Sequence, residues 1–386
     1  MRNHLYPSTA SPRCISSRRA YRILPVGLRA SWLPFALLVR SQSVTGGNLR
    51  FLSKNMSRDE KPPSQPAVPS PQPLATQYGG RHTGGWVDRL PASWVPYIQL
   101  ARLSPPAGVF LVFFPHLFGI LHGARLQEAT LAQTLRVGLY VSLGSFFLSN
   151  AIHGWNDLID APIDRLVART RDRPVARGAI SPRGALLFTI SQGLAGAALL
   201  LALPREATWA AIPSAVGNFY YPWSKRHTHF AQLVLGFCLA WGVPVGTAAM
   251  GVAPWSDAAL APTACLCLCS VLWTVIYDTI YAFQDVADDE KIGLKSMAVL
   301  FRNQAHTILF IILSGLVGLL TTYGRLLGLT GAYYLVGCGG CLSSLGLMIA
   351  NVDLKNPQSC WWWFRYGFWL AGGSITGGLL TQYILY

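Results

Sequence analysis

Long apolar runs are the feature that most limits how this chain can fold. Nine runs are separated by short polar segments, and most approach the length that an α-helix needs to cross a bilayer. They cover roughly residues 106–123, 136–154, 185–203, 207–221, 231–253, 259–283, 305–323, 327–350 and 364–386. With 52% hydrophobic and 12% charged residues, the chain is too apolar for a soluble domain of this length. The sequence predicts an all-α polytopic membrane protein, with about nine transmembrane helices around one central cavity.

Acidic residues are rare and lie mainly where two of these runs end. Of the 16 in the chain, seven form two clusters, Asp157, Asp160 and Asp164 in the first and Asp278, Asp285, Asp288 and Asp289 in the second. Spacings of three and four residues place the first three on one helical face, where they repel each other unless a cation joins them. Mg²⁺ shared with a substrate diphosphate is the expected cation. An ordinary solvated loop is the alternative for each cluster.

Loop charges give an independent prediction of topology. Most basic loop residues fall on one side, Arg165, Arg169, Arg171, Arg173, Arg177, Arg183, Lys225, Arg226, Lys291, Lys295, Arg302, Lys355 and Arg365. The other side receives only Arg125, Arg136, Arg205 and Arg325. The positive-inside rule then places both acidic clusters on one face, toward the cytosol or the mitochondrial matrix.

Several of these basic residues follow the acidic clusters closely. Arg173 comes after the first cluster, Lys225 and Arg226 end the fourth run, and Lys295 comes after the second cluster. Phosphate oxygens that no metal binds need cationic donors, and arginine supplies a planar, two-pronged one. Each of these residues is as suited to setting topology as to binding a ligand, but together with the acids they favour a diphosphate site.

The N-terminal segment accounts for most of the net charge of +15. Residues 1–58 hold nine Arg and one Lys and no acid, which indicates a mitochondrial transit peptide over about residues 1–55 rather than a nucleic-acid surface. A disordered leader, with initiation at Met56, is the alternative. Residues 56–95 form a proline-rich linker. The protein would therefore lie in the mitochondrial inner membrane, or without a transit peptide in the endoplasmic reticulum or another intracellular membrane.

Four motifs in order resemble the UbiA family of intramembrane aromatic prenyltransferases, over residues 96–386. They are Asn156 to Asp164 followed by Arg169 to Pro174, Tyr221 to Arg226, Asp278 to Asp289, and Gly293 to Ser296. The segment Tyr277 to Ala282 is similar to the 4-hydroxybenzoate polyprenyltransferase branch. The resemblance implies transfer of an isoprenyl group, farnesyl or longer, from its diphosphate to a ring carbon of a phenolic acid. It also implies lipid bilayer contact and no nucleic-acid partner.

Roles for individual residues follow from the clusters and the resemblance together. We expect Mg²⁺ to be held by five carboxylates, Asp157, Asp160, Asp164, Asp285 and Asp289. The residues expected to bind substrate are Arg102, Asn156, Arg173, Lys225, Arg226 and Lys295. The candidate catalytic residues are Asp278, Asp285 and Tyr281, and either aspartate would polarise the phenol. The resemblance suggests that Arg102 holds the carboxylate of the acceptor.

Two departures from the ubiquinone enzymes bear on the acceptor. The chain reads Arg102-Leu103-Ser104-Pro105-Pro106-Ala107-Gly108 where those enzymes usually have Arg-Leu-Asp-Lys-Pro-x-Gly, and it has Phe283 where they carry a histidine. This favours fungal meroterpenoid synthesis, with Phe283 near the acceptor, whereas the basic N-terminus favours mitochondrial ubiquinone synthesis.

A membrane transporter is the distant alternative. A transporter predicts buried acids near the middle of its spans. Here the acids lie at span ends, which favours the enzyme.

Overall fold

The computed structural model describes residue 80 and residues 85–385. By its internal contacts the chain divides into two units, Met1–Ser64 and Gln65–Tyr386, and every described residue belongs to the second. The basic segment 1–55 and most of the linker 56–95 lie outside the described residues, so these assignments stay predictions. Every regular element in the described part is a helix, which confirms the all-α prediction.

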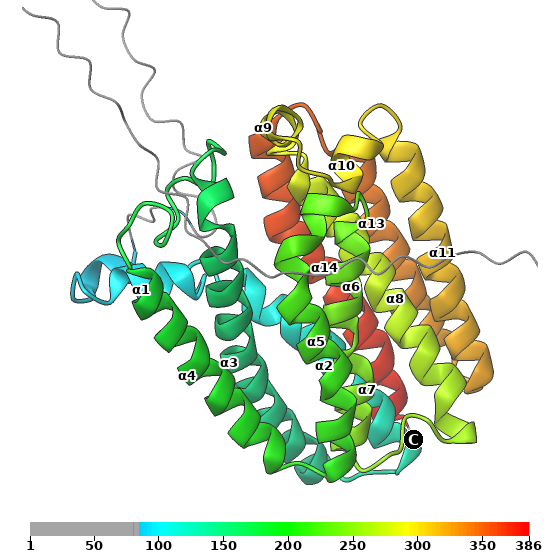
Figure 1. The fold of residues 1–386 in the computed structure, drawn as a ribbon. Helices are drawn as coiled ribbons and strands as arrows, with labels where there is room; N and C mark the ends of the chain where they lie inside the picture. Colours follow the sequence, from blue (N-terminus) through cyan, green and yellow to red (C-terminus); the bar gives the residue numbers. More distant parts are fainter. Residues whose placement is uncertain (1–79, 81–84, 386) are drawn as a thin grey trace, which may run out of the picture. The chain divides into compact units, whose positions relative to one another are not determined.

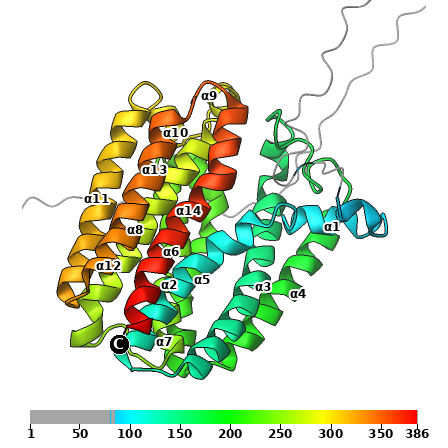
Figure 2. The same cartoon turned by 180° about the vertical axis from the view of Figure 1, so that it is seen from behind.

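Most residues lie in long helices, shown in Figures 1 and 2. These helices are α2 (Ala107–Leu126), α3 (Leu131–Asp164), α4 (Pro182–Leu201), α5 (Arg205–His227), α6 (Ala231–Ala240), α7 (Gly242–Ala249), α8 (Asp257–Ala282), α11 (Ala305–Leu326), α13 (Gly340–Asn351) and α14 (Pro357–Ile384). A short α12 (Gly331–Tyr333) and a π-helical turn (Tyr334–Gly339) run directly into α13. The remaining pieces are a 3-10 turn (Val87–Arg89), α1 (Val95–Leu100), α9 (Val286–Ile292) and α10 (Met297–Leu300).

Seven segments in the described part are long and apolar enough to cross a membrane. All nine predicted runs lie in helices, but the count of nine spans is not confirmed, because α5 and α14 do not meet that test. Helix α5 has charged residues at both ends and two internal prolines, and α14 is rich in glycine, serine and glutamine. These residues lower the hydropathy of both helices.

Helix α2 is central to the packing. It contacts α3, α7, α8 and α14, while α3 packs along α4 and α8 along α6 and α11. One apolar core joins α2, α8, α11, α13 and α14, and a smaller one joins α2, α3, α5 and α7. The long helices accordingly run alongside one another in both views (Figures 1 and 2).

Glycines allow α2 and α7 to approach each other closely. A Cβ atom added at Gly119 would lie 2.0 Å from the carbonyl oxygen of Val243, and one at Gly246 would lie 2.2 Å from that of His116. Thr247 Oγ1 lies 3.3 Å from the Gly119 carbonyl oxygen and donates to it. Small residues that bring two backbones together are a common basis of helix association in membranes.

The two predicted acidic clusters lie at the same end of the helices. Helix α3 ends at Asp164, and α8 ends at Ala282 just before α9. Figure 1 shows the α3–α4 connection and α9 at this end. The backbone amide of Ala168, in the α3–α4 connection, donates to Asp288 Oδ2 at 3.1 Å. The fold thus joins segments that are more than a hundred residues apart in the chain.

Candidate active site

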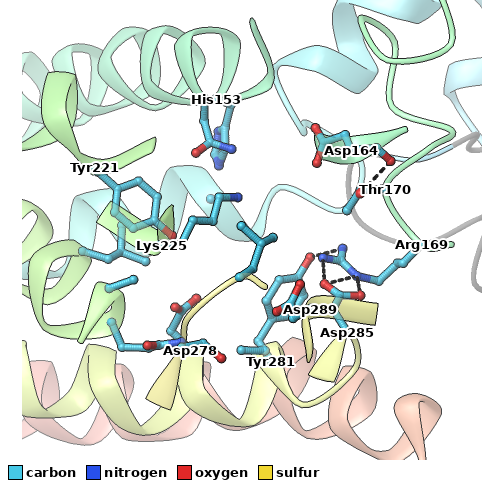
Figure 3. A pocket seen from close by; sticks show the side chains of 18 of the residues that line it. His153, Asp164, Arg169, Thr170, Tyr221, Lys225, Asp278, Tyr281, Asp285 and Asp289 are labelled. Atoms are coloured by element: carbon cyan, nitrogen blue, oxygen red, sulfur yellow. Dashed lines mark hydrogen bonds and ion pairs between the residues drawn. The ribbon is translucent and has the colours of Figure 1, made fainter. Parts of the chain in front are cut away.

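A cavity of about 190 Å³ lies where these segments meet. Its polar lining comes from α3, α5, α6, α8, α9 and the connections that follow α1, α3 and α9 (Figure 3). The polar side chains are Arg102, His153, Asn156, Asp164, Arg169, Thr170, Arg173, Tyr221, Lys225, Gln232, Tyr277, Asp278, Tyr281, Asp285, Asp289, Lys295 and Ser296. The lining therefore contains five cationic and four acidic side chains.

The first acidic cluster forms one buried face of α3. Asp157 and Asp160 are fully buried and Asp164 is 3% exposed. Asp157 Oδ1 accepts from Arg102 Nη2 at 2.7 Å and lies 3.4 Å from Arg173 Nη1. The same Arg173 nitrogen donates to both carboxylate oxygens of Asp164, at 3.1 and 3.0 Å. Buried charges are stable only when they are paired in this way.

Asp160 is paired with the end of α5. Its Oδ2 lies 2.5 Å from Lys225 Nζ, and its Oδ1 lies 3.7 Å from Arg226 Nη2. Arg226 also donates to the carbonyl oxygen of Ile159 at 3.0 Å and is not part of the cavity wall. Lys225 does line the cavity, so this one side chain contacts both the buried Asp160 carboxylate and the cavity.

The second cluster meets the α3–α4 connection through Arg169. Arg169 Nε donates to Asp285 Oδ1 at 2.8 Å, and its Nη2 donates to Oδ2 at 2.5 Å. Its Nη1 donates to the Tyr281 hydroxyl at 2.6 Å, and its guanidinium lies 4.8 Å from the centre of the Tyr281 ring. Figure 3 shows this group at one edge of the cavity. A planar guanidinium can hold a carboxylate in this two-pronged way, whereas an ammonium group cannot.

Asp289 faces the cavity from α9. Burial, and then the neighbouring Asp285 carboxylate, raise the pKa of Asp289 to about 7. A negative charge on Asp289 is therefore unfavourable until a cation reaches it. Asp278, near the end of α8, also lines the cavity (Figure 3).

Arg102 occupies an unusual backbone position. It follows α1 with a φ angle of 53°, in the left-handed region that side chains other than glycine adopt infrequently. Its side chain is 8% exposed and lines the cavity while it binds Asp157. Such local strain persists where the surrounding structure holds the residue in place, and it often accompanies a functional site.

The predicted site residues divide into two groups. Ten line the cavity, Arg102, Asn156, Asp164, Arg173, Lys225, Asp278, Tyr281, Asp285, Asp289 and Lys295. Three do not line it, because Asp157 and Asp160 are fully buried and Arg226 is exposed. Among the described residues, no three His, Cys, Asp or Glu side chains are arranged as a metal site, because the carboxylates are paired with cations instead. The metal ligands remain a prediction.

Five polar residues of the cavity wall have no role that the sequence indicated, although all lie in the family motifs or beside them: Thr170, Tyr221, Gln232, Tyr277 and Ser296. His153 also lines the cavity, and its Nδ1 lies 3.3 Å from Ser149 Oγ. By contrast, Phe283 is buried in the main core and does not line the cavity. The expectation that Phe283 lies near the acceptor therefore stays a prediction, and its burial in the core weighs against it.

Helices long and apolar enough to cross a membrane surround a cavity lined by arginine, lysine and aspartate, an arrangement typical of a membrane-embedded enzyme. The chain belongs to the UbiA prenyltransferase family, whose model matches residues 112–372. It is thus a UbiA-type aromatic prenyltransferase, which sets the transporter hypothesis aside.

The curated proteins that this chain resembles are named as prenyltransferases. The chain is 38% identical to the ascA prenyltransferase of Acremonium egyptiacum, over 69% of this chain and 80% of the relative. It is also 38% identical to the mitochondrial 4-hydroxybenzoate polyprenyltransferase of Saccharomyces cerevisiae, over 78% of this chain and 80% of the relative. The stbC prenyltransferase of Stachybotrys bisbyi is 35% identical, over 83% and 97%.

Solved structures share the fold at lower sequence identity. A UbiA homologue from Aeropyrum pernix K1 has a TM-score of 0.58 and 22% identity, over 72% of this chain and 97% of that one. A UbiA homologue from Archaeoglobus fulgidus bound to GPP and Mg²⁺ has a TM-score of 0.54 and 18% identity, over 74% and 99%. At these identities the comparison shows a common fold.

Proposed function

We propose that the enzyme moves an isoprenyl group, farnesyl or longer, from its diphosphate to a ring carbon of a phenolic aromatic acid. The observation that carries this proposal is the convergence of carboxylates from both acidic clusters and of five cationic side chains on one cavity at the end of α3 and α8. Cations in a water-poor cavity favour binding of a diphosphate and stabilise its charge as it departs.

The cavity suits Mg²⁺ as a cofactor. Asp157 Oδ2 and Asn156 Oδ1 are buried oxygens that have no hydrogen-bond partner in the described part of the chain. Asn156, Asp164, Asp285 and Asp289 line the cavity and would supply oxygen donors of the kind that Mg²⁺ prefers, whereas Asp157 and Asp160 would have to become accessible to bind it. When bound, Mg²⁺ would neutralise the diphosphate and make it a better leaving group.

The chain's own residues have three tasks in this chemistry. Arg173, Lys225 and Lys295 bind phosphate oxygens while the allylic C–O bond breaks and its electron pair leaves with the diphosphate. The faces of Tyr281 and Phe364, whose ring centres lie 4.4 Å apart, then stabilise the allylic cation. The helices exclude water, which would otherwise capture that cation.

The acceptor completes the reaction from the same cavity. Asp278 draws the phenol hydroxyl toward it, a ring carbon ortho to that hydroxyl forms the new C–C bond, and the ring then loses its proton to a carboxylate. Arg102 binds the acceptor carboxylate. We infer a role in fungal meroterpenoid synthesis from the altered segment Arg102 to Gly108.

Ubiquinone synthesis is the second candidate. The yeast 4-hydroxybenzoate polyprenyltransferase matches this chain as well as the ascA prenyltransferase does, and residues 1–55 have the composition of a transit peptide. A fusion of residues 1–55 to a fluorescent protein would enter mitochondria in that case. Rescue of yeast that lacks its own 4-hydroxybenzoate prenyltransferase would favour this role over meroterpenoid synthesis.

Turnover by the purified protein tests the proposal directly. The enzyme in lipid nanodiscs would be incubated with Mg²⁺, with geranyl, farnesyl and geranylgeranyl diphosphates, and with a panel of phenolic acids, and products would be identified by mass spectrometry. We expect a C-prenylated acid that is absent with Asp278→Asn. Release of prenyl alcohol alone, with no C-prenylated product from any acid, would contradict the proposal.

A further inference from the structure

The segment ahead of the first long helix exposes three large aromatic side chains. This segment, residues 85–100, contains the 3-10 turn Val87–Arg89 and helix α1 (Val95–Leu100). Trp86 is 49% exposed, Trp94 is 60% exposed and Tyr97 is 37% exposed. Exposed apolar side chains that gather on one short segment mark a surface that contacts another molecule or a membrane.

The other face of α1 packs against the protein. Gln99 is buried, and its Oε1 accepts from Arg177 Nη2, in the α3–α4 connection, at 2.6 Å. Leu100 is fully buried in a small core that it shares with Ala161, Val175, Ile180 and Ala185. Helix α1 therefore has one face that the protein covers and one face, with Trp94 and Tyr97, that the described part of the chain leaves exposed.

Helix α1 lies at the end of a predicted membrane span. It runs across the start of α4 instead of alongside it (Figures 1 and 2), and the Tyr97 ring lies 5.5 Å from the ring of Phe188, in the second turn of α4. Helix α4 is long and apolar enough to cross a membrane, and its outward face exposes Leu187, Ile190 and Leu194. The exposed surface thus changes from aliphatic on α4 to aromatic on α1.

This change is the one expected between the hydrocarbon core and the headgroups of a bilayer. Tryptophan and tyrosine are enriched at the membrane–water interface, where the ring is buried and its polar atom reaches water. Arg89 and Arg183 are exposed on the same segment and on the first turn of α4, where they suit anionic headgroups. The surface on α1 is therefore continuous with the lipid-facing surface of α4.

We propose that Trp86, Trp94 and Tyr97 insert into the headgroup region of the bilayer, and that this contact holds Arg102 in position in the active site. The inference goes beyond the proposed function, because it assigns a partner to a surface outside the cavity. Arg102 comes two residues after α1, is 8% exposed, and donates to Asp157 Oδ1 at 2.7 Å. Arg102 thus connects the lipid-facing segment to the active site.

Backbone hydrogen bonds connect α1 to Arg102. The amide of Ala101 donates to the carbonyl oxygen of Tyr97 at 2.9 Å, and the amides of Arg102 and Leu103 donate to those of Gln99 and Ile98, each at 3.1 Å. The φ angle of 53° at Arg102 is a backbone conformation that persists only where the surroundings enforce it. If α1 lost its contact with the bilayer, these hydrogen bonds would open more often.

Photo-crosslinking identifies what covers the aromatic face. In the full-length protein, p-benzoylphenylalanine would replace Trp94, and the protein in lipid nanodiscs would be irradiated and analysed by mass spectrometry. We expect a lipid adduct at position 94, as at Leu187 on the outward face of α4, and none at Arg171, which is exposed in the α3–α4 connection. Cross-links from position 94 to residues 1–79 or to a second copy of the chain, or no lipid adduct there, would overturn the inference.

Hydrogen–deuterium exchange tests the effect on Arg102 without substrate. In nanodiscs, Trp86→Ala/Trp94→Ala should speed the exchange of residues 101–103 by about 5-fold or more, with no change in unfolding temperature, and tyrosine at both positions should restore slow exchange. Trp209→Ala/Trp255→Ala is the control, because both side chains are exposed at the opposite end of the helices. Unchanged exchange in the first variant, or equal acceleration in the control, would overturn the role of the anchor at Arg102. Both measurements can succeed even if no phenolic acid is prenylated, so their outcome is separate from that of the proposed function.

Discussion

Arg169 and Asp285 form a two-pronged ion pair between the α3–α4 connection and the residue that precedes α9, with nitrogen–oxygen distances of 2.8 and 2.5 Å. Arg169 also binds the hydroxyl of Tyr281, so one side chain fixes two residues of the second motif relative to the end of the first. Arg169, Tyr281 and Asp285 all line the cavity, so the Arg169–Asp285 ion pair sets the shape of the active site as well as its charge.

Replacing Arg169 with lysine should damage the site while keeping its charge. An ammonium group cannot donate to both oxygens of Asp285 and to Tyr281 in one plane. We expect kcat/KM for the donor to fall by about 10- to 100-fold, which corresponds to about 1.4–2.7 kcal/mol. Arg171→Lys is the control, because Arg171 is exposed in the same segment. Equal activity of the two variants would show that the geometry of the pair does not matter.

Activity should depend on Mg²⁺ and on the carboxylates of the cavity. Addition of EDTA should abolish turnover, and added Mg²⁺ should restore it. In Asp285→Asn the Mg²⁺ concentration needed for half-maximal rate should rise, because a neutral amide binds a hard cation more weakly than a carboxylate does. Asp257→Asn, at the opposite end of the Asp257–Ala282 helix, serves as the control. Full turnover after exhaustive chelation would reject the metal assignment.

Residue periodicity was enough to predict an all-α membrane protein, and motif spacing together with the family resemblance singled out ten residues that line one cavity. They did not show that Asp157 and Asp160 lie behind the cavity wall, because spacing places side chains on a helical face without showing what covers it. In the folded chain Arg102, Arg173 and Lys225 cover that face. Likewise, the position of Phe283 between the cavity-lining residues Ala282 and Asp285 could not reveal that its own side chain is buried in the core.

The close contact of α2 and α7 should not tolerate a methyl group. Gly119→Ala places a Cβ atom 2.0 Å from the carbonyl oxygen of Val243, and this backbone atom cannot move unless helix α7 moves as a whole. We expect a loss of about 1–3 kcal/mol in the free energy of unfolding, measured by denaturant unfolding in mixed micelles. Gly318→Ala, on α11 with nothing within 4 Å of the added atom, should be neutral or slightly stabilising. If both variants lose the same stability, the glycine contact is not what limits the packing.

We expect Phe283 not to determine which phenolic acid the enzyme accepts, although the sequence alone suggests that this side chain lies near the acceptor. Phe283 is 5% exposed and packs in the same core as Tyr277 and Val286, so Phe283→His buries a polar ring among apolar side chains. We expect a loss of stability of about 1–3 kcal/mol, with the ratio of kcat/KM for an orsellinate-like acid and for 4-hydroxybenzoate unchanged. Leu300→His, at a position that is 44% exposed on the short helix α10 outside the membrane spans, should change neither quantity. A shift of the ratio toward 4-hydroxybenzoate in Phe283→His would mean that this side chain reaches the acceptor after all, because a purely structural change would lower both rates alike.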